Sequence, residues 1–455
     1  MIKRSVLNSI ERKFILLVGD LIIAFVAINF LVSYGVDEKY VSLDLKFWMF
    51  GIGVFTDLFL SYVLDFYNLE KIARRRYVLS QSIYIGSLFV FVVFISAVIL
   101  FDASFWRIPL LSFLILTPLQ IVLWRLFFSN MFKIIPVTKK VLFLYDESTS
   151  DVLQRNISKI DGEGVETFYR VKLTFSSEQH NSSQRKWFLS AADKIDALIV
   201  NVSSYDSLPK NLQNMLLEAI LKGKEVISFT SFYENVYEAL PIRSNNDSFY
   251  EILHLKNKKI RYLQAIFSFL VNFFLSFFVG IIFVVSVPFI WFLNLFFNKG
   301  PLFYTQVRVG QYGKEFKIYK FRSMIVDAEK TGAKMASKND TRITPFGKVL
   351  RAFRFDELPQ IISVMKGHMH FIGPRPERKV FVDELNQIIP FYNCRHLVKP
   401  GITGWAQVKY KYGENLDQSI NKLEYDLYYI KNKSIMLDLR IVFKTITTVI
   451  FSRGV

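Results

Sequence analysis

An apolar stretch at residues 263–297 limits the fold of this chain more than any other feature, because it holds no charged side chain. As one helix it would be about 50 Å long at ~1.5 Å per residue, which exceeds the ~30 Å apolar core of a bilayer. Pro288 lies inside it and is expected to break or bend the helix. Basic residues flank both ends: Lys256, Lys258, Lys259 and Arg261 before it, then Lys299, Arg308, Lys314 and Lys317 after it. Because positive flanks favour the cytoplasmic face, the pattern predicts a re-entrant helix hairpin, with a kinked fifth crossing as the alternative.

Four further apolar runs come earlier in the chain, at residues 14–36, 46–66, 79–101 and 108–132. Each is near the ~20 residues that a helix needs to cross a bilayer. Positive residues cluster before the first run, between the second and third, and after the fourth. Residues 1–136 are therefore predicted to form a four-helix transmembrane bundle with both ends inside. Asp20, Asp57 and Arg125 fall within the runs, where they are expected to pair between helices; a transport pathway is the alternative.

Residues 137–250 predict a soluble α/β domain on the cytoplasmic side. Strand-like runs at 141–145, 197–202 and 226–229 alternate with helical patterns, which predicts a parallel sheet of the Rossmann type. A dinucleotide site would need a glycine-rich turn after the first strand, but residues 146–150 read Asp-Glu-Ser-Thr-Ser. A structural, dimerising or regulatory module is therefore expected, with nucleotide binding as the alternative.

The net charge of +18 limits the partners of the chain. Nucleic acid, an anionic membrane surface or phosphorylated substrates could each explain it. The sequence carries no recognised nucleic-acid reading motif, and its basic residues after 298 are interleaved with Gly-Pro turns. Nucleic acid is therefore not an expected partner. The single cysteine, Cys394, excludes an internal disulfide framework.

The adjacent carboxylates Asp356 and Glu357 are the candidate reactive groups. Because Pro359 is tolerated only in the first turn of a helix, the pair is expected at a helix start, where backbone N–H groups favour anions. Arg351 and Arg354 lie just upstream and are expected to favour the ionised form of Asp356. Such a site suits a phosphate beside a nucleophilic or metal-binding carboxylate; a helix cap with its ion pairs is the alternative.

Basic residues near glycine and proline lie on both sides of this stretch. Lys320 and Arg322 come before it, and Arg375 follows it in a Gly-Pro-Arg-Pro turn. Rigid turns of this kind present guanidinium and backbone donors to phosphate. None of these motifs alone indicates one function. The order and spacing of the motifs along the chain do.

The C-terminal motifs closely resemble those of the monotopic phosphoglycosyl transferases, or bacterial sugar transferases, over nearly all of residues 263–455. With the four N-terminal runs and the α/β domain, the chain resembles the larger members, the polyprenyl-phosphate hexose-1-phosphate transferases. The resemblance implies a mostly helical catalytic domain at 251–455, anchored by the re-entrant hairpin on the cytoplasmic face of the bacterial inner membrane. The family's helix-breaking proline falls on Pro288, although its Ser-Pro pair is here Ser286 and Pro288, separated by Val287.

The resemblance also implies which residues act. Asp356 and Glu357 are the catalytic pair and would hold Mg²⁺. Arg351 and Arg375 match the family's phosphate-binding arginines. The further candidates for substrate binding are Lys320, Arg322 and Arg354.

The implied reaction uses Asp356 as a nucleophile. It would attack the β-phosphate of a UDP-hexose and release UMP, after which undecaprenyl phosphate would take the phosphosugar from Asp356. This is the first membrane step of exopolysaccharide, capsule or O-antigen assembly, with membrane lipids and a second copy of the chain (a homodimer) as further partners. The alternatives are a transporter built on the four spans and a glycosyltransferase that releases UDP.

Overall fold

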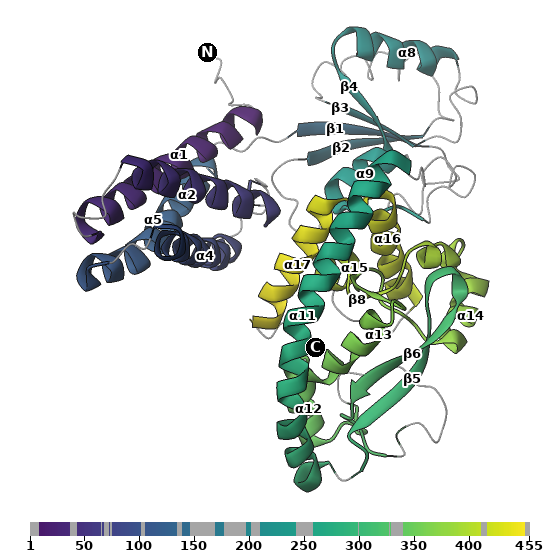
Figure 1. The fold of residues 1–455 in the computed structure, drawn as a ribbon. Coiled ribbons are helices and arrows are strands. Elements are labelled where there is room, and N and C mark those ends of the chain that lie inside the picture. The colour runs from purple at the N-terminus through teal and green to yellow at the C-terminus, as the bar shows by residue number, and fades with distance from the viewer. Residues whose placement is uncertain are drawn as a thin grey trace. The chain divides into compact units, whose positions relative to one another are not determined.

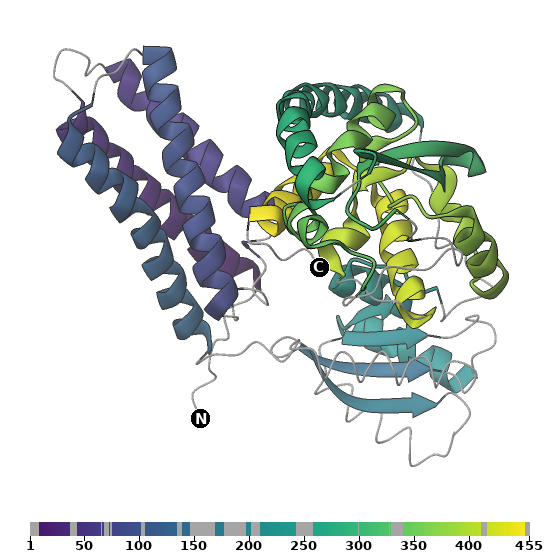
Figure 2. The same ribbon diagram turned by 90° about the horizontal axis from the view of Figure 1, so that it is seen from below.

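The computed structural model describes residues 9–36, 43–64, 66–67, 72, 75–101, 105–133, 139–145, 169–176, 197–201, 210–242, 258–298, 300–326, 328, 340–410 and 416–450. The chain divides into two compact units. The N-terminal unit contains Met1–Ile199 and Leu208–Val226, and the C-terminal unit contains Val200–Ser207 and Ile227–Val455. Figure 1 labels the elements of each unit, and Figure 2 gives a second view of them.

The apolar runs of the N-terminal unit all form helices. These are α1 (Ser9–Phe30) with its π-helical extension η1 (Leu31–Gly35), α2 (Leu43–Val63), α4 (Arg75–Phe101) and α5 (Arg107–Lys133). Helices α1 and α4 each pack against α2 and α5. Leu31, Phe89 and Phe113 are buried between them, while apolar side chains such as Phe47 and Ile99 are exposed. By length and composition these helices could cross a membrane, as could one helix of the C-terminal unit, so the chain has the character of a membrane protein.

Charged residues inside this group of helices are buried. Arg125 on α5 forms an ion pair with Asp20 on α1 and donates a hydrogen bond to the carbonyl of Phe66 (3.1 Å). The Tyr67 hydroxyl donates to Asp20 (2.9 Å), so the predicted pairing between helices is confirmed for Asp20 and Arg125. Asp57 on α2 is also buried and interacts electrostatically with both, but it forms no hydrogen bond or ion pair with the residues that the structure describes.

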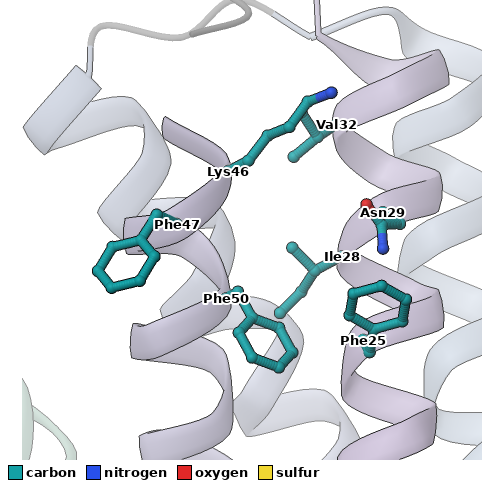
Figure 3. Close-up of a pocket in the computed structure, with 7 residues that line it drawn as sticks. All are labelled: Phe25, Ile28, Asn29, Val32, Lys46, Phe47 and Phe50. Carbon is teal, nitrogen blue, oxygen red and sulfur yellow. The ribbon is translucent and has the colours of Figure 1, made fainter. Parts of the chain in front are cut away.

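A pocket of about 440 Å³ opens between α1 and α2 (Figure 3). Its lining residues are Phe25, Ile28, Asn29, Val32, Lys46, Phe47 and Phe50. Asn29 and Lys46 supply its polar groups, and the other walls are aromatic or aliphatic. A lining of this composition suits a hydrocarbon chain better than a sugar nucleotide.

A four-stranded sheet follows the helices in the chain. Its strands lie in the order β2 (Tyr169–Ser176), β1 (Lys139–Tyr145), β3 (Ala197–Asn201) and β4 (Glu225–Ser228). Strands β1 and β2 pair in parallel, as the α/β pattern predicts, and α8 (Lys210–Leu221) lies between β3 and β4 in the chain. Residues 146–150, where a dinucleotide site would need a glycine-rich turn, lie outside the described residues.

Strand β4 passes directly into helix α9 (Phe229–Tyr237). The hydroxyl of Ser228 caps this helix by accepting a hydrogen bond from the amide of Ser231 (3.2 Å). The strand predicted at 226–229 therefore ends one residue early, because Ser228 is a good helix cap.

Helix α9 and the residues after it belong to the C-terminal unit. Tyr233 donates a hydrogen bond to Glu424 (2.9 Å), and Leu240 and Ile242 are buried in the C-terminal core. This unit thus includes the chain from Ile227, whereas the sequence pattern placed the boundary at 250–251. The difference arises because α9 directly follows a strand, as the helices of an α/β domain do, but contacts a helix residue that comes 191 positions later in the chain.

The C-terminal unit is mostly helical. Its helices are α11 (Lys258–Phe297), α12 (Pro345–Ala352), α13 (Ile361–Met365), α14 (Lys379–Ile388), α15 (Trp405–Lys409), α16 (Leu416–Asn432) and α17 (Ile435–Ile450). Short 3-10 helices are η4 (Gln311–Gly313), η5 (Phe355–Gln360) and η6 (Tyr392–Leu397). Strands β5 (Phe303–Val309) and β6 (Glu315–Phe321) form an antiparallel pair, and β7 (His370–Ile372) pairs in parallel with β8 (Gly401–Thr403).

Helix α11 is the long apolar stretch, and it runs along one side of this unit (Figure 1). One stripe of its side chains, from Val271 to Phe283, packs on the C-terminal core. The Asn272 carboxamide accepts a hydrogen bond from the amide of Phe371 (2.7 Å), while most other α11 side chains are exposed and apolar. The helix continues through Pro288 rather than ending there, so the predicted break is not seen; a proline removes a single backbone donor and can be accommodated within a helix.

We expect a chain that begins at Ile227 to fold, and one that begins at Ile252 to be much less stable. The shorter chain loses the bond from Tyr233 and the buried side chains of Leu240 and Ile242. Losing two buried aliphatic side chains costs several kcal/mol, or a melting temperature about 10 °C lower. Thermal melting of both chains in detergent tests this, and equal melting temperatures would contradict it.

Among the buried charges, Asp20→Asn should destabilise the N-terminal unit far more than Asp57→Asn. The first change leaves the buried Arg125 without its ion pair, which typically costs about 3–5 kcal/mol. The second removes a carboxylate that forms no hydrogen bond or ion pair with the described residues. Melting temperatures of the two variants in detergent compare them directly; a larger loss for Asp57→Asn would show that this assignment is wrong.

Candidate active site

Asp356 and Glu357 lie in the first turn of η5, which confirms the predicted helix start. Arg354 joins α12 to η5 in the left-handed conformation, with φ of 56°. The next residues along η5 anchor the pair, because Leu358 packs against a cluster that includes Ile290 of α11. Both carboxylate side chains are buried, with 7% of each residue exposed, so their charges are poorly screened by water.

Glu357 is surrounded by cations. One of its oxygens accepts a hydrogen bond from Arg375 (2.7 Å) and lies 3.5 Å from the ammonium of Lys320. Its other oxygen is 3.5 Å from the guanidinium of Arg354. Burial alone would raise the pKa of Glu357, but Arg375, Lys320 and Arg354 together outweigh burial and hold that pKa well below its usual range. Glu357 is therefore ionised and fixes three cations around the site.

Asp356 differs from its neighbour. Its carboxylate forms no hydrogen bond or ion pair with the described residues. Burial, with the nearby charge of Glu357, raises the pKa of Asp356 against the opposing effect of Lys320, Arg351 and Arg375. The expectation that arginines would favour its ionised form is thus wrong for the protein alone, because desolvation exceeds their effect. The carboxylate stays available for a ligand.

Lys320, which reaches Glu357 from β6, is largely buried. Burial lowers the pKa of Lys320, and the attraction of Glu357 opposes that shift. The structure therefore brings three of the predicted substrate-binding residues, Lys320, Arg354 and Arg375, directly to the carboxylate pair.

Arg351 approaches the pair from the last turn of α12. Its Nε donates a hydrogen bond to the hydroxyl of Ser323 (2.9 Å), a buried residue after β6. The start of the same helix is fixed to that residue too, because the Thr344 amide donates to the Ser323 carbonyl (3.2 Å). The orienting role of Ser323 could not be read from the sequence.

Arg322 is placed differently from the other predicted residues. Its backbone carbonyl accepts a hydrogen bond from Asn298 (2.8 Å), just after α11. A side chain at Gly300 would collide with the Arg322 guanidinium, whose Nη1 has no hydrogen-bond partner among the described residues. Nothing in the described contacts joins Arg322 to the carboxylate pair, so its predicted role in substrate binding stays a prediction.

The loop that carries Arg375 is held by two other arginines. Arg395 donates to the carbonyl of Arg375 (2.9 Å), and Arg308 donates to the carbonyl of Pro376 (3.1 Å). Arg395 is buried and forms an ion pair with Asp426 on α16 (2.9 Å). Burial raises the pKa of Asp426 to about 6, against the effect of Arg395. These contacts position Arg375, and sequence reasoning missed Arg395 because it lies in no phosphate-binding motif.

The side chains of the site determine whether it could bind a metal ion. The described residues contain no group of three or more His, Cys, Asp or Glu side chains that could hold a metal ion. Mg²⁺ is commonly held by one or two carboxylates together with substrate phosphates. Asp356 fits that pattern, since its oxygens form no hydrogen bond or ion pair with the described residues, whereas the oxygens of Glu357 already face three cations.

Taken together, the site combines one available carboxylate with a ring of fixed positive charge. The cations lie where a diphosphate could be neutralised, and partly buried hydrogen bonds help to position Arg351 and Arg375. A carboxylate so placed can attack phosphorus or bind a cation.

Comparisons with known proteins cover this C-terminal part of the chain. A family model described as "Bacterial sugar transferase" matches residues 263–452. The chain is 52% identical over 157 residues to the UDP-N-acetylgalactosamine-undecaprenyl-phosphate N-acetylgalactosaminephosphotransferase of Aeromonas hydrophila, covering 34% of this chain and 37% of that protein. It is 43% identical over 151 residues to the UDP-glucose:undecaprenyl-phosphate glucose-1-phosphate transferase of Escherichia coli K12, covering 33% and 32%.

A shorter relative is matched over most of its length. The exopolysaccharide production protein PSS of Rhizobium leguminosarum bv. phaseoli is 37% identical over 174 residues, which are 36% of this chain and 87% of that protein. By contrast, the match spans only about a third of the length of the two larger relatives.

Asp426→Asn should weaken the binding of inorganic diphosphate about tenfold, because it loosens Arg395 and so the loop that presents Arg375. Asp438→Asn is the matched control. Asp438 is also buried, with its pKa raised by burial to about 6, but it accepts a hydrogen bond from Tyr429 (2.9 Å), and its described contacts do not include the loop. Calorimetric titration of both variants tests this, and equal weakening by the two would count against the positioning role.

Proposed function

This chain belongs to the bacterial sugar transferase family, and from that premise we propose that it transfers a hexose 1-phosphate from a UDP-sugar to undecaprenyl phosphate, releasing UMP. The proposal rests on one observation: two adjacent buried carboxylates have different surroundings. Glu357 holds three cations and Asp356 is unengaged among the described residues. The names of the relatives support the substrates, since they include UDP-glucose, UDP-N-acetylgalactosamine and undecaprenyl phosphate.

In the proposed mechanism, a carboxylate oxygen of Asp356 attacks the β-phosphorus of the UDP-sugar. The bond between that phosphorus and the oxygen bridging to the α-phosphate breaks, and UMP leaves. A terminal phosphate oxygen of undecaprenyl phosphate then attacks the same phosphorus, and Asp356 leaves as a carboxylate. The two anionic substrates visit the site in turn, so their mutual repulsion is avoided.

The cations have distinct parts in this proposal. Arg375 and Lys320 bridge between Glu357 and the donor diphosphate, and Arg351 reaches the phosphate from the side fixed by Ser323. Fixed positive groups in a buried site stabilise charge that develops on the leaving UMP. Mg²⁺, held by Asp356 and the donor phosphates, would neutralise further negative charge and favour the ionised form of Asp356.

Helix α11 supports the membrane placement that we propose. Its packing stripe begins at Val271, and after the helix ends Asn298 still contacts the same unit. A helix that crossed a ~30 Å apolar core while packed in this way would draw the catalytic unit into the bilayer. We therefore propose that α11 enters the bilayer without crossing it, bent rather than broken at Pro288, with the catalytic unit on the cytoplasmic face of the bacterial inner membrane. We propose that this reaction is the first membrane step in the assembly of a surface polysaccharide.

The product separates this function from its nearest rival, a glycosyltransferase that releases UDP. We expect the purified full chain to form UMP from undecaprenyl phosphate and at least one of UDP-glucose, UDP-galactose and UDP-N-acetylgalactosamine. Activity should be lost with EDTA and restored by Mg²⁺. Asp356→Asn should lower turnover by a factor of about a thousand or more, because the nucleophile is lost. Nucleotide products are separated by chromatography, and UDP as the product would exclude the proposal.

Asp383→Asn is the matched control for that experiment. Asp383 and Glu384 form another Asp-Glu pair, but they are exposed on α14. This variant should keep full activity. Intact mass after mixing the unmodified chain with donor alone should show a hexose-phosphate adduct, and its absence under every quench would leave Asp356 as a metal ligand only.

A further inference from the structure

The three residues just before Asp356 present two chemically different surfaces. Arg354 turns its guanidinium towards Glu357 (3.5 Å). Its neighbours Phe353 and Phe355 are exposed instead, by 55% and 38%, and their ring centroids lie 6.3 Å apart. An apolar aromatic pair therefore borders a strongly cationic site.

This aromatic pair continues an apolar surface. Val349 lies one turn before Phe353 on α12 and is 52% exposed. Helix α12 packs against α11, and Phe346 contacts Phe297 at the end of α11, with ring centroids 6.3 Å apart. Since α11 itself exposes apolar side chains over most of its surface, the exposed face of α12 lies next to the part of the molecule suited to lipid.

We propose that Phe353 and Phe355 bind the first apolar units of the lipid acceptor, while the neighbouring arginines bind its phosphate. This inference rests on the proposed function. A UDP-sugar has no extended apolar part, whereas a polyprenyl phosphate joins a phosphate directly to a hydrocarbon chain. A phosphate beside Arg354 puts the start of that chain against the two exposed rings. The aromatic pair thus serves the acceptor and not the donor.

The test separates the two substrates by steady-state kinetics in detergent, with the full chain and UMP as the readout. The double variant Phe353→Ala with Phe355→Ala should raise the KM for undecaprenyl phosphate about tenfold, as expected when the acceptor loses its apolar contact with two rings. Its KM for the UDP-sugar should change less than twofold. Farnesyl phosphate, a short acceptor, should show the same ratio, because the contact lies next to the phosphate.

Two controls sharpen the result. The double variant Phe353→Leu with Phe355→Leu should recover most of the acceptor affinity, since leucine keeps the apolar contact. Ile388→Ala, on α14, removes an equally exposed apolar side chain (52%) elsewhere in the unit and should change neither KM.

Other outcomes overturn the inference. If the alanine variant keeps the acceptor KM of the unmodified chain in detergent, the two rings do not bind the acceptor. Equal changes in both KM values would mean a general disturbance of the site. A failure of the unmodified chain to release UMP would instead refute the proposed function itself.

Discussion

The buried carboxylate of Glu357 balances cations that come from three separate segments of the C-terminal unit. Lys320 comes from β6, Arg354 from the turn after α12, and Arg375 from the loop after β7. Brought together without a counter-ion, these like charges would repel one another strongly, because burial reduces the screening by water. Their shared partner lets the fold concentrate positive charge in one place. The chemistry proposed for Asp356 depends on that arrangement, because a phosphate enters a buried site only where cations balance its charge.

A second dependence links the site to α11. The helix exposes most of its apolar surface but packs one stripe on the unit, and Leu358 beside the carboxylate pair meets Ile290 of the same helix. The backbone of the catalytic segment is therefore braced by the part of the chain most suited to lipid. In the proposed reaction, this arrangement brings a water-soluble nucleotide and a membrane-bound acceptor to the same pair of carboxylates.

Local patterns in the sequence predicted the features that local forces determine. Apolar length identified the helices of the N-terminal unit, and Pro359 identified the start of η5. Features that depend on distant residues were missed. Tyr233 and Glu424, for example, are 191 residues apart in the chain, and the pattern of apolar residues does not predict their hydrogen bond.

The predicted direction of the pKa shift of Asp356 was wrong, and the cause is related. Counting neighbouring arginines captures attraction, but the depth of burial, which dominates here, appears only in the fold. The role of Arg395 was hidden in the same way, because its partners Asp426 and Tyr392 and the Arg375 carbonyl meet only after folding.

The left-handed backbone at Arg354 has a consequence for protein engineering. For most residues with a Cβ atom, adopting that conformation costs roughly 1 kcal/mol. Glycine or asparagine would adopt it more readily. A library selected for heat resistance alone would therefore favour glycine at this position. The selected proteins would gain stability while losing a cation beside Glu357, so stability and function are opposed at a single backbone angle.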